Sequence, residues 1–226
     1  PVCATWLGRG RCALSTSSNE QKVESMNKLP INGDLVGLSI DPISHSWTNR
    51  DTMLYALGIG CRPPDDLDFI YEGRGPKVVP TFAVIPGLRA MGSAMQRIHI
   101  NLAALLHGEQ YVTTHRPLPA AAEVTVEGRI AAVWDKGKAA VIEFEGIGYD
   151  NEGPLFAVRA SLFVLGGGGW GGERGPSGSA ASNAAPARDP DVVVERETRP
   201  EQAAIYRLSG DMNPMHIDPD FANNAG

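Results

Sequence analysis

Three consecutive runs of the chain, residues 122–134, 138–149 and 155–165, alternate apolar and polar side chains. A period of two places every second side chain on the same face of a strand, so these runs predict three strands. Residues 135–137 and 150–153 between them carry the Asp, Asn and Gly residues of hairpin turns. An antiparallel sheet with one covered face is therefore predicted. The positions expected on the covered face are Val124, Val126, Ile142, Phe144, Phe156, Val158, Leu162 and Val164.

The region before these strands is less regular. Residues 80–85 are apolar and predict a strand, and residues 106–112 predict another. Between them, Ala90, Met91, Ala94, Met95 and Ile98 have helical spacing, but Gly87 and Gly92 weaken a helix.

Two segments have the spacing of a capping box, in which a Thr hydroxyl and an acidic side chain three residues later cap a helix. They are residues 48–51, Thr-Asn-Arg-Asp, and residues 198–201, Thr-Arg-Pro-Glu. We expect one helix from Thr48 to Gly58 or Gly60, and another from near Thr198 to Gly210. Asp218 and Pro219 look like the cap and first residue of a third helix.

The two segments are related by a constant difference in residue number. It aligns Thr48 with Thr198, Asp51 with Glu201, Gly60 with Gly210, Cys61 with Asp211 and Asp66 with His216. The chain therefore looks like two copies of one unit, of which only the second carries an acid and an imidazole.

Composition narrows the classes of protein. The chain has 226 residues, 42% of them hydrophobic, which predicts a globular body. The net charge of −6 argues against binding to nucleic acid or to an anionic membrane. No apolar run approaches the roughly 20 residues of a membrane helix, so no membrane insertion is expected. Three cysteines, Cys3, Cys12 and Cys61, suit a reducing compartment and do not form a metal site.

The candidate chemistry lies between the last two predicted helices. Asp211 and His216 are five positions apart, and a carboxylate can orient an imidazole and stabilise its cation. Asn213 could position a water molecule by hydrogen bonding. Two alternatives remain: His216 could be a structural histidine at a helix end, or Asp211, His216 and Asp218 could hold a metal ion, which we do not favour.

The stretch from Tyr206 to Phe221, Tyr-Arg-Leu-Ser-Gly-Asp-Met-Asn-Pro-Met-His-Ile-Asp-Pro-Asp-Phe, resembles the active-site segment of MaoC-like hydratases, in particular the 2-enoyl-CoA hydratase 2 branch. The resemblance implies an α+β double hot-dog fold, in which each of two pseudo-repeats wraps an antiparallel sheet around a central helix. It implies a non-catalytic first unit over residues 28–165, which accommodates the acyl chain. A Gly/Ser/Pro-rich linker over 166–190 and the start of a catalytic unit over 191–226 follow. Residues 1–27 are read as a mobile extension.

The second unit would be incomplete in this chain, because the resemblance covers about the first three-quarters of a family domain. A glycine that polarises the thioester carbonyl would lie beyond Gly226. Whether this chain is active by itself is therefore left open, and a fragment that only binds acyl-CoA is one alternative.

The implied activity is that of a lyase that hydrates trans-2-enoyl-CoA to (3R)-3-hydroxyacyl-CoA in fatty-acid β-oxidation. Asp211 and His216 would activate a water that Asn213 helps to fix. A related MaoC-like dehydratase acting on other acyl thioesters is the alternative within the fold. No cofactor is implied, because CoA is part of the substrate. A homodimer or other assembly is expected, in the peroxisome of a eukaryote or the cytoplasm of a bacterium.

The resemblance also implies supporting residues in the first unit. Residues 106–112, Leu-His-Gly-Glu-Gln-Tyr-Val, are similar to the family's first-unit strand, so His107, Gly108 and Glu109 could shape the acyl-CoA pocket or fasten a strand end. Glu72 matches a family glutamate. In the family this unit lacks a regular long helix, so Met91 and Met95 would line an apolar tunnel or fill the core.

Overall fold

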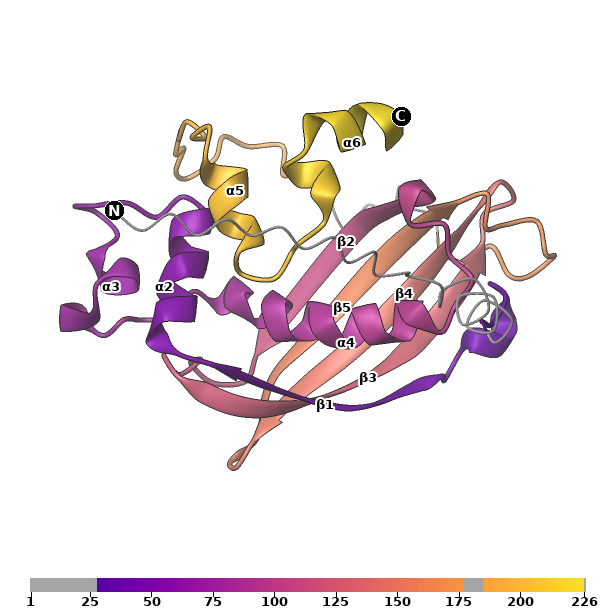
Figure 1. Ribbon diagram of the computed structural model, residues 1–226, viewed down its shortest axis with the longest axis horizontal. Helices are drawn as coiled ribbons and strands as arrows, with labels where there is room; N and C mark the ends of the chain where they lie inside the picture. Colours follow the sequence, from indigo (N-terminus) through magenta and orange to yellow (C-terminus); the bar gives the residue numbers. More distant parts are fainter. Residues whose placement is uncertain (1–27, 177–184, 226) are drawn as a thin grey trace, which may run out of the picture.

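An antiparallel sheet of five strands forms the centre of the structure (Figure 1), a computed structural model that describes residues 28–176 and 185–225. The order across the sheet is β1-β3-β4-β5-β2, so β1 and β2 are the edge strands. The predicted mobile extension over 1–27 lies outside the described residues. The strands are β1 (Ser39–Trp47), β2 (Leu105–Thr114), β3 (Ala122–Asp135), β4 (Ala139–Asp150) and β5 (Gly153–Leu165).

The three strands predicted from alternation are confirmed to within two residues as β3, β4 and β5, and the strand over 106–112 is confirmed within β2. All eight positions expected on the covered face are at most 5% exposed. Strand β1 was not predicted from the sequence. Its alternation is broken by a register shift between Ile40 and Ile43, where Asp41 and Pro42 stand, because a bulge adds a residue to one strand.

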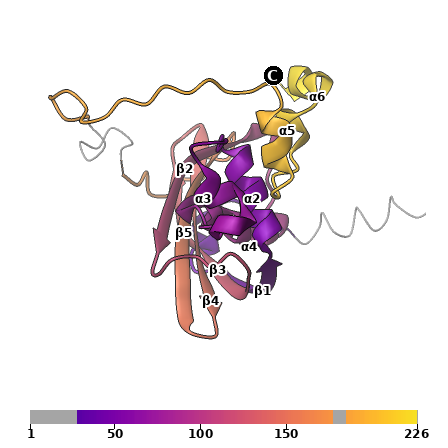
Figure 2. The same ribbon diagram turned by 90° about the vertical axis from the view of Figure 1, so that its left-hand side faces the viewer.

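One helix, α4 (Val84–Gln96), covers the inner face of the sheet (Figures 1 and 2). The strand predicted over 80–85 is therefore wrong, since η3 (Pro80–Ala83) and the first turn of α4 occupy it. Pro80 and Pro86 are tolerated because the first N–H groups of a helix need no partner within it. The run is apolar because this helix lies in the core.

The expectation that the first unit lacks a regular long helix is also wrong, because α4 continues for 13 residues through Gly87 and Gly92. Gly87 has a packing role: a Cβ there would lie 2.5 Å from Val158 Cγ2 on β5. The missing side chain therefore allows the helix to lie close against the sheet.

The remaining helical elements are shorter than α4. They are η1 (Gly33–Leu35), α2 (Asn49–Gly58), α3 (Leu67–Ile70), η2 (Glu72–Arg74), η4 (Leu102–Ala104), α5 (Gln202–Arg207), η6 (Pro214–His216) and α6 (Pro219–Ala225). The cap predicted for α2 is confirmed, because Asp51 Oδ2 accepts from the Thr48 N–H at 2.8 Å and from the Thr48 hydroxyl at 2.7 Å. Of the described helices, none is both long and apolar enough to cross a membrane.

The glycine-rich run after β5 folds back onto the turn between β3 and β4. Asp135 Oδ1 accepts from the N–H groups of Gly137 and Gly169, both at 2.8 Å, and its Oδ2 accepts from Gly171 at 2.7 Å. The Asp135 N–H in turn donates to the carbonyl of Glu173 at 2.8 Å. Residues 166–176, which the predicted linker included, are thus held against the sheet, while 177–184 lie outside the described residues. The backbone of this loop surrounds a carboxylate of its own chain.

Replacing this carboxylate should change the acid sensitivity of the fold. Hydrogen bonds from Gly169 and Gly137 lower the pKa of Asp135 from 3.8 to about 2. A lowered pKa stabilises the folded state above the unfolded value, and this stabilisation is lost as pH falls from about 4 towards 2. We expect Asp135→Asn to lower Tm at pH 7 and to flatten the decline of Tm over that interval, as measured by circular dichroism. The exposed Asp41→Asn variant is the control. An equal Tm deficit for Asp135→Asn at pH 7 and pH 2 would contradict this role.

Candidate active site

The loop between α5 and α6 carries the candidate residues. Helix α5 begins at Gln202 and has no side-chain cap, so the capping box predicted over 198–201 is wrong and the start predicted near Thr198 is four residues too early. Pro200 explains the delay, because a proline disfavours helical backbone at the residue before it. Gly210, with a φ of +138°, follows the helix, where the glycine permits this conformation. The cap predicted for α6 is confirmed, since Asp218 Oδ1 accepts from the N–H of Asp220 at 2.9 Å.

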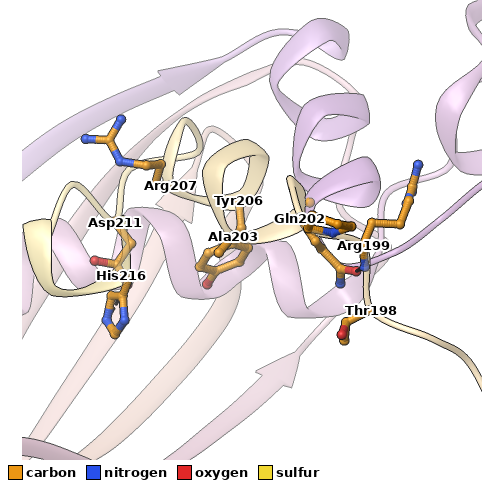
Figure 3. A pocket seen from close by; sticks show the side chains of 10 residues that line it. Thr198, Arg199, Gln202, Ala203, Tyr206, Arg207, Asp211 and His216 are labelled. Carbon is orange, nitrogen blue, oxygen red and sulfur yellow. Dashed lines mark hydrogen bonds and ion pairs between the residues drawn. The ribbon is translucent and has the colours of Figure 1, made fainter. Parts of the chain in front are cut away.

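Asp211 and His216 are brought together in this loop. Their Oδ2 and Nε2 atoms are 3.9 Å apart, with side chains 33% and 54% exposed (Figure 3). This distance exceeds a hydrogen bond, but it is short enough for an ion pair whenever the imidazole carries a proton. Catalytic hydrogen bonds are often long without substrate. The other oxygen, Asp211 Oδ1, accepts from the Asn213 N–H at 3.3 Å, which leaves Oδ2 towards the histidine.

Asn213 holds the turn. Its Oδ1 accepts from the Met215 N–H at 3.0 Å and so caps η6. The residue does not line the cavity that Asp211 and His216 share. The structure therefore gives the side-chain oxygen of Asn213 a partner in the backbone, and leaves only its amide N–H groups for a water molecule.

The shared cavity has a volume of about 500 Å³. Its wall joins the end of α2 to the segment before α5, to α5 itself and to the loop after it (Figure 3). Two arginines, Arg199 and Arg207, are among the residues of this wall. Sequence reasoning missed most of these residues. The lining consists of Gly58, Thr198, Arg199, Pro200, Gln202, Ala203, Tyr206, Arg207, Asp211 and His216.

Tyr206 links the cavity to the core. Its ring centroid lies 5.9 Å from that of Tyr55, which in turn meets Phe82 edge-on at 5.5 Å. Burial, Tyr55 and Asp211 all raise the pKa of Tyr206, so its phenol stays protonated and can donate a hydrogen bond. A neutral donor therefore stands near the Asp211 carboxylate.

The supporting residues expected in the first unit are not brought to this cavity. Glu72 is exposed in η2, while His107, Gly108 and Glu109 are exposed at the register shift of edge strand β2. Glu109 accepts a hydrogen bond from the Tyr111 hydroxyl at 3.2 Å. Both residues of this hydrogen bond lie on β2, so it does not tie the strand to a neighbour. A supporting role for His107 and Glu109 stays a prediction.

The two methionines belong to the core. Met91 is 6% exposed within the core of buried residues, and Met95 packs against that core. This position favours the core-filling alternative over the apolar tunnel.

The counterpart positions in the first unit hold a different arrangement. Gly60, with a φ of +102°, matches Gly210 as expected from the offset. Asp66, the counterpart of His216, instead accepts from Arg196 Nη1 at 2.9 Å. Burial, and then Asp66, raise the pKa of the Cys61 thiol. Throughout residues 28–176 and 185–225, no three His, Cys, Asp or Glu side chains come together as metal ligands.

Comparison with known proteins identifies relatives over nearly the whole described chain. The family model of the MFE-2 hydratase 2 N-terminal domain matches residues 45–166, and that of the MaoC like domain matches residues 181–226. The mouse peroxisomal multifunctional enzyme type 2 is 41% identical over 198 residues, which are 84% of this chain and 27% of that protein. The 3-hydroxyacyl-thioester dehydratase Y of Mycobacterium tuberculosis is 43% identical over 201 residues, covering 86% of this chain and 68% of that protein.

A solved structure shows the same architecture. The MaoC-like dehydratase from Phytophthora capsici matches with a TM-score of 0.73 and 29% identity, over 88% of this chain and 70% of that chain. The likeness confirms the predicted α+β hot-dog fold for the sheet and its central helix.

Proposed function

The chain belongs to the family of the MFE-2 hydratase 2 and MaoC-like domains, and on this basis we propose that it is a lyase that hydrates trans-2-enoyl-CoA to (3R)-3-hydroxyacyl-CoA. One observation supports this proposal most directly. Asp211 and His216 lie 3.9 Å apart in a cavity of about 500 Å³, between two helices that hold the loop.

The proposed reaction uses the pair as a proton-transfer unit. His216 takes a proton from a water molecule as its oxygen bonds to C3 of the enoyl group, and Asp211 stabilises the imidazolium that forms. The imidazolium of His216 then passes a proton on to C2, so that the elements of water are added and the pair returns to its starting charge. Asn213, through its free amide N–H groups, would help to hold the water.

The positive wall of the cavity suits the substrate. Arg199 and Arg207 can attract the phosphates of a CoA ester, although the chain as a whole is acidic. Ala203 and Pro200 give the same wall apolar atoms against which an acyl chain could pack. The (3R) stereochemistry and the role in β-oxidation are carried over from the family resemblance as part of this proposal.

The test is the loss of enoyl absorbance with trans-2-decenoyl-CoA. We expect hydration to proceed, and to survive dialysis against EDTA, because the proposal needs no cofactor. Binding of decenoyl-CoA without hydration would reject catalysis in favour of an acyl-CoA-binding role. Loss of activity on dialysis, restored by a metal ion, would reject the metal-free mechanism.

A second candidate, dehydration of a 3-hydroxyacyl thioester, is supported by the similarity to the mycobacterial 3-hydroxyacyl-thioester dehydratase Y. Because the two reactions are the reverse of each other, the candidates differ in which thioester the site prefers and not in the direction of catalysis. Rates with crotonyl, decenoyl and branched thioesters would show which class this site prefers.

We propose a homodimer or other assembly, with the peroxisome as compartment in a eukaryote and the cytoplasm in a bacterium. The peroxisomal names of the mouse and Arabidopsis relatives and the bacterial relative support this pair of alternatives. Light scattering after gel filtration would measure the assembly.

A further inference from the structure

Helix α5 contacts the last turn of α2 at backbone distance. A Cβ built on Gly58 would lie 2.8 Å from Tyr206 Cα, 3.1 Å from its N and 3.2 Å from its Cβ. Real Cβ atoms essentially never approach backbone atoms within 3.0 Å. Gly58 does not have a positive φ, so space alone requires a glycine here. Any larger residue would displace α5.

The segment before α5 is tied to the same end of α2. Arg196 Nη1 donates to Asp66 Oδ2 at 2.9 Å and to the Gly60 carbonyl at 3.4 Å. Arg199 Nη2 donates to the Cys61 carbonyl at 3.4 Å. Residues 58–66 therefore contact α5 and the segment before it at several points. We refer to residues 58–66 as the α2 seat.

The seat lies close to the candidate chemistry. Tyr206, which touches Gly58, is in the last turn of α5, and Asp211 follows five residues later in the loop. Gly58 and Tyr206 line the same cavity as Asp211 and His216. A displacement of α5 by a fraction of an ångström would therefore be passed directly to the loop.

We propose that Gly58 is a positioning residue, whose lack of a side chain sets the placement of Asp211 and His216 through α5. The proposal rests on the proposed function only for its kinetic consequence. A role for the seat in placing the loop stands without it. Because geometric errors near one ångström can cost about 100-fold in rate, a single methyl group at Gly58 should be felt in catalysis.

The test compares two glycines in helices. Gly58→Ala inserts a methyl group against Tyr206, whereas a Cβ at Gly92 in α4 meets nothing within 4 Å. Alanine is the better helix former in both helices, so helix propensity cannot explain a difference. We expect Gly58→Ala to lower kcat for decenoyl-CoA hydration at least tenfold with little change in KM, and Gly92→Ala to leave both unchanged.

A second readout does not depend on activity. Amide hydrogen exchange of residues 198–217, followed by mass spectrometry, should be faster in Gly58→Ala than in the parent protein, with β3, β4 and β5 unchanged. If the parent protein has no hydratase activity but exchange is still faster in Gly58→Ala, the role of the α2 seat is supported and the proposed function is rejected. Parent-like exchange and parent-like kcat in Gly58→Ala would overturn the inference.

A third variant covers the case in which Gly58→Ala does not fold. Arg196→Gln adds no atoms to the packed contact and removes the ion pair with Asp66. Faster exchange of residues 198–217 is expected here also. Unchanged exchange in Arg196→Gln, together with failure of Gly58→Ala to fold, would show that Gly58 serves the fold and not the placement of the loop.

Discussion

Asp211→Asn and His216→Gln are each expected to lower kcat for enoyl-CoA hydration by a factor of about 10²–10⁴, the usual contribution of a positioned acid or base. His216→Gln removes the group that takes the proton from water. Asp211→Asn keeps the size of the side chain but removes the charge that stabilises the imidazolium. Stopped-flow measurement of enoyl absorbance would give the rate of each variant.

The fold should survive both changes. The two side chains are 33% and 54% exposed and pair with each other at 3.9 Å, outside the core. Two exposed residues, His99 and Asp220, supply matched controls as His99→Gln and Asp220→Asn. The double variant Asp211→Asn/His216→Gln should be little slower than the slower single variant, because residues that act as a unit are not additive. A near-normal rate in either single variant, with an unchanged circular dichroism spectrum, would refute the assignment.

The strands could be predicted because alternation is a local property. Each of β3, β4 and β5 has one face against α4 and one face outwards, so burial repeats every second residue. Strand β1 could not be found in this way. Asp41 and Pro42 break its alternation, and only pairing with β3 shows that the strand continues through them.

Helix α4 was missed for a different reason, because its first residues were predicted as a strand. A helix wrapped by a sheet is buried on much of its surface, so its sequence carries apolar residues where an amphipathic helix would have polar ones. Residues 80–85 therefore had the composition of a buried strand. Gly87 weakened the prediction of a helix because glycine has a low helix propensity. The close packing of α4 against the sheet nevertheless requires a glycine there.

The candidate site likewise contains residues that could be predicted from the sequence and residues that could not. Asp211 and His216 were predictable because both lie in one short loop between two helices, which brings them together locally. Gly58 and Tyr206 are 148 residues apart, and no local pattern indicates that they touch. Glu72, His107 and Glu109 were carried over from the resemblance, and their placement depends on long-range packing that the sequence alone does not specify. Whether they act in the reaction stays a prediction.

Phe156→Ala is expected to destabilise the protein by about 3–5 kcal/mol, the usual cost of deleting a buried aromatic ring. Phe156 is 0% exposed and belongs to the hydrophobic core. It stands opposite Gly148 on β4, and a Cβ on that glycine would lie 2.2 Å from the ring. The ring thus occupies the space that a side chain at 148 would fill. Because Gly148 has no side chain to move into the cavity, we expect a loss near the upper end of the range.

The neighbouring Phe163 on the same strand provides the control, because it lies on the outer face and is half-buried. Phe163→Ala should cost about 1–2 kcal/mol, since less apolar surface is lost from burial. Urea unfolding followed by both circular dichroism and tryptophan fluorescence would measure the two free energies. Equal losses for the two variants would mean that the inner face of the sheet does not carry the main core. A clearly larger loss for Phe156→Ala than for Phe163→Ala is the expected result, because only the Phe156 ring is fully buried in the core over Gly148.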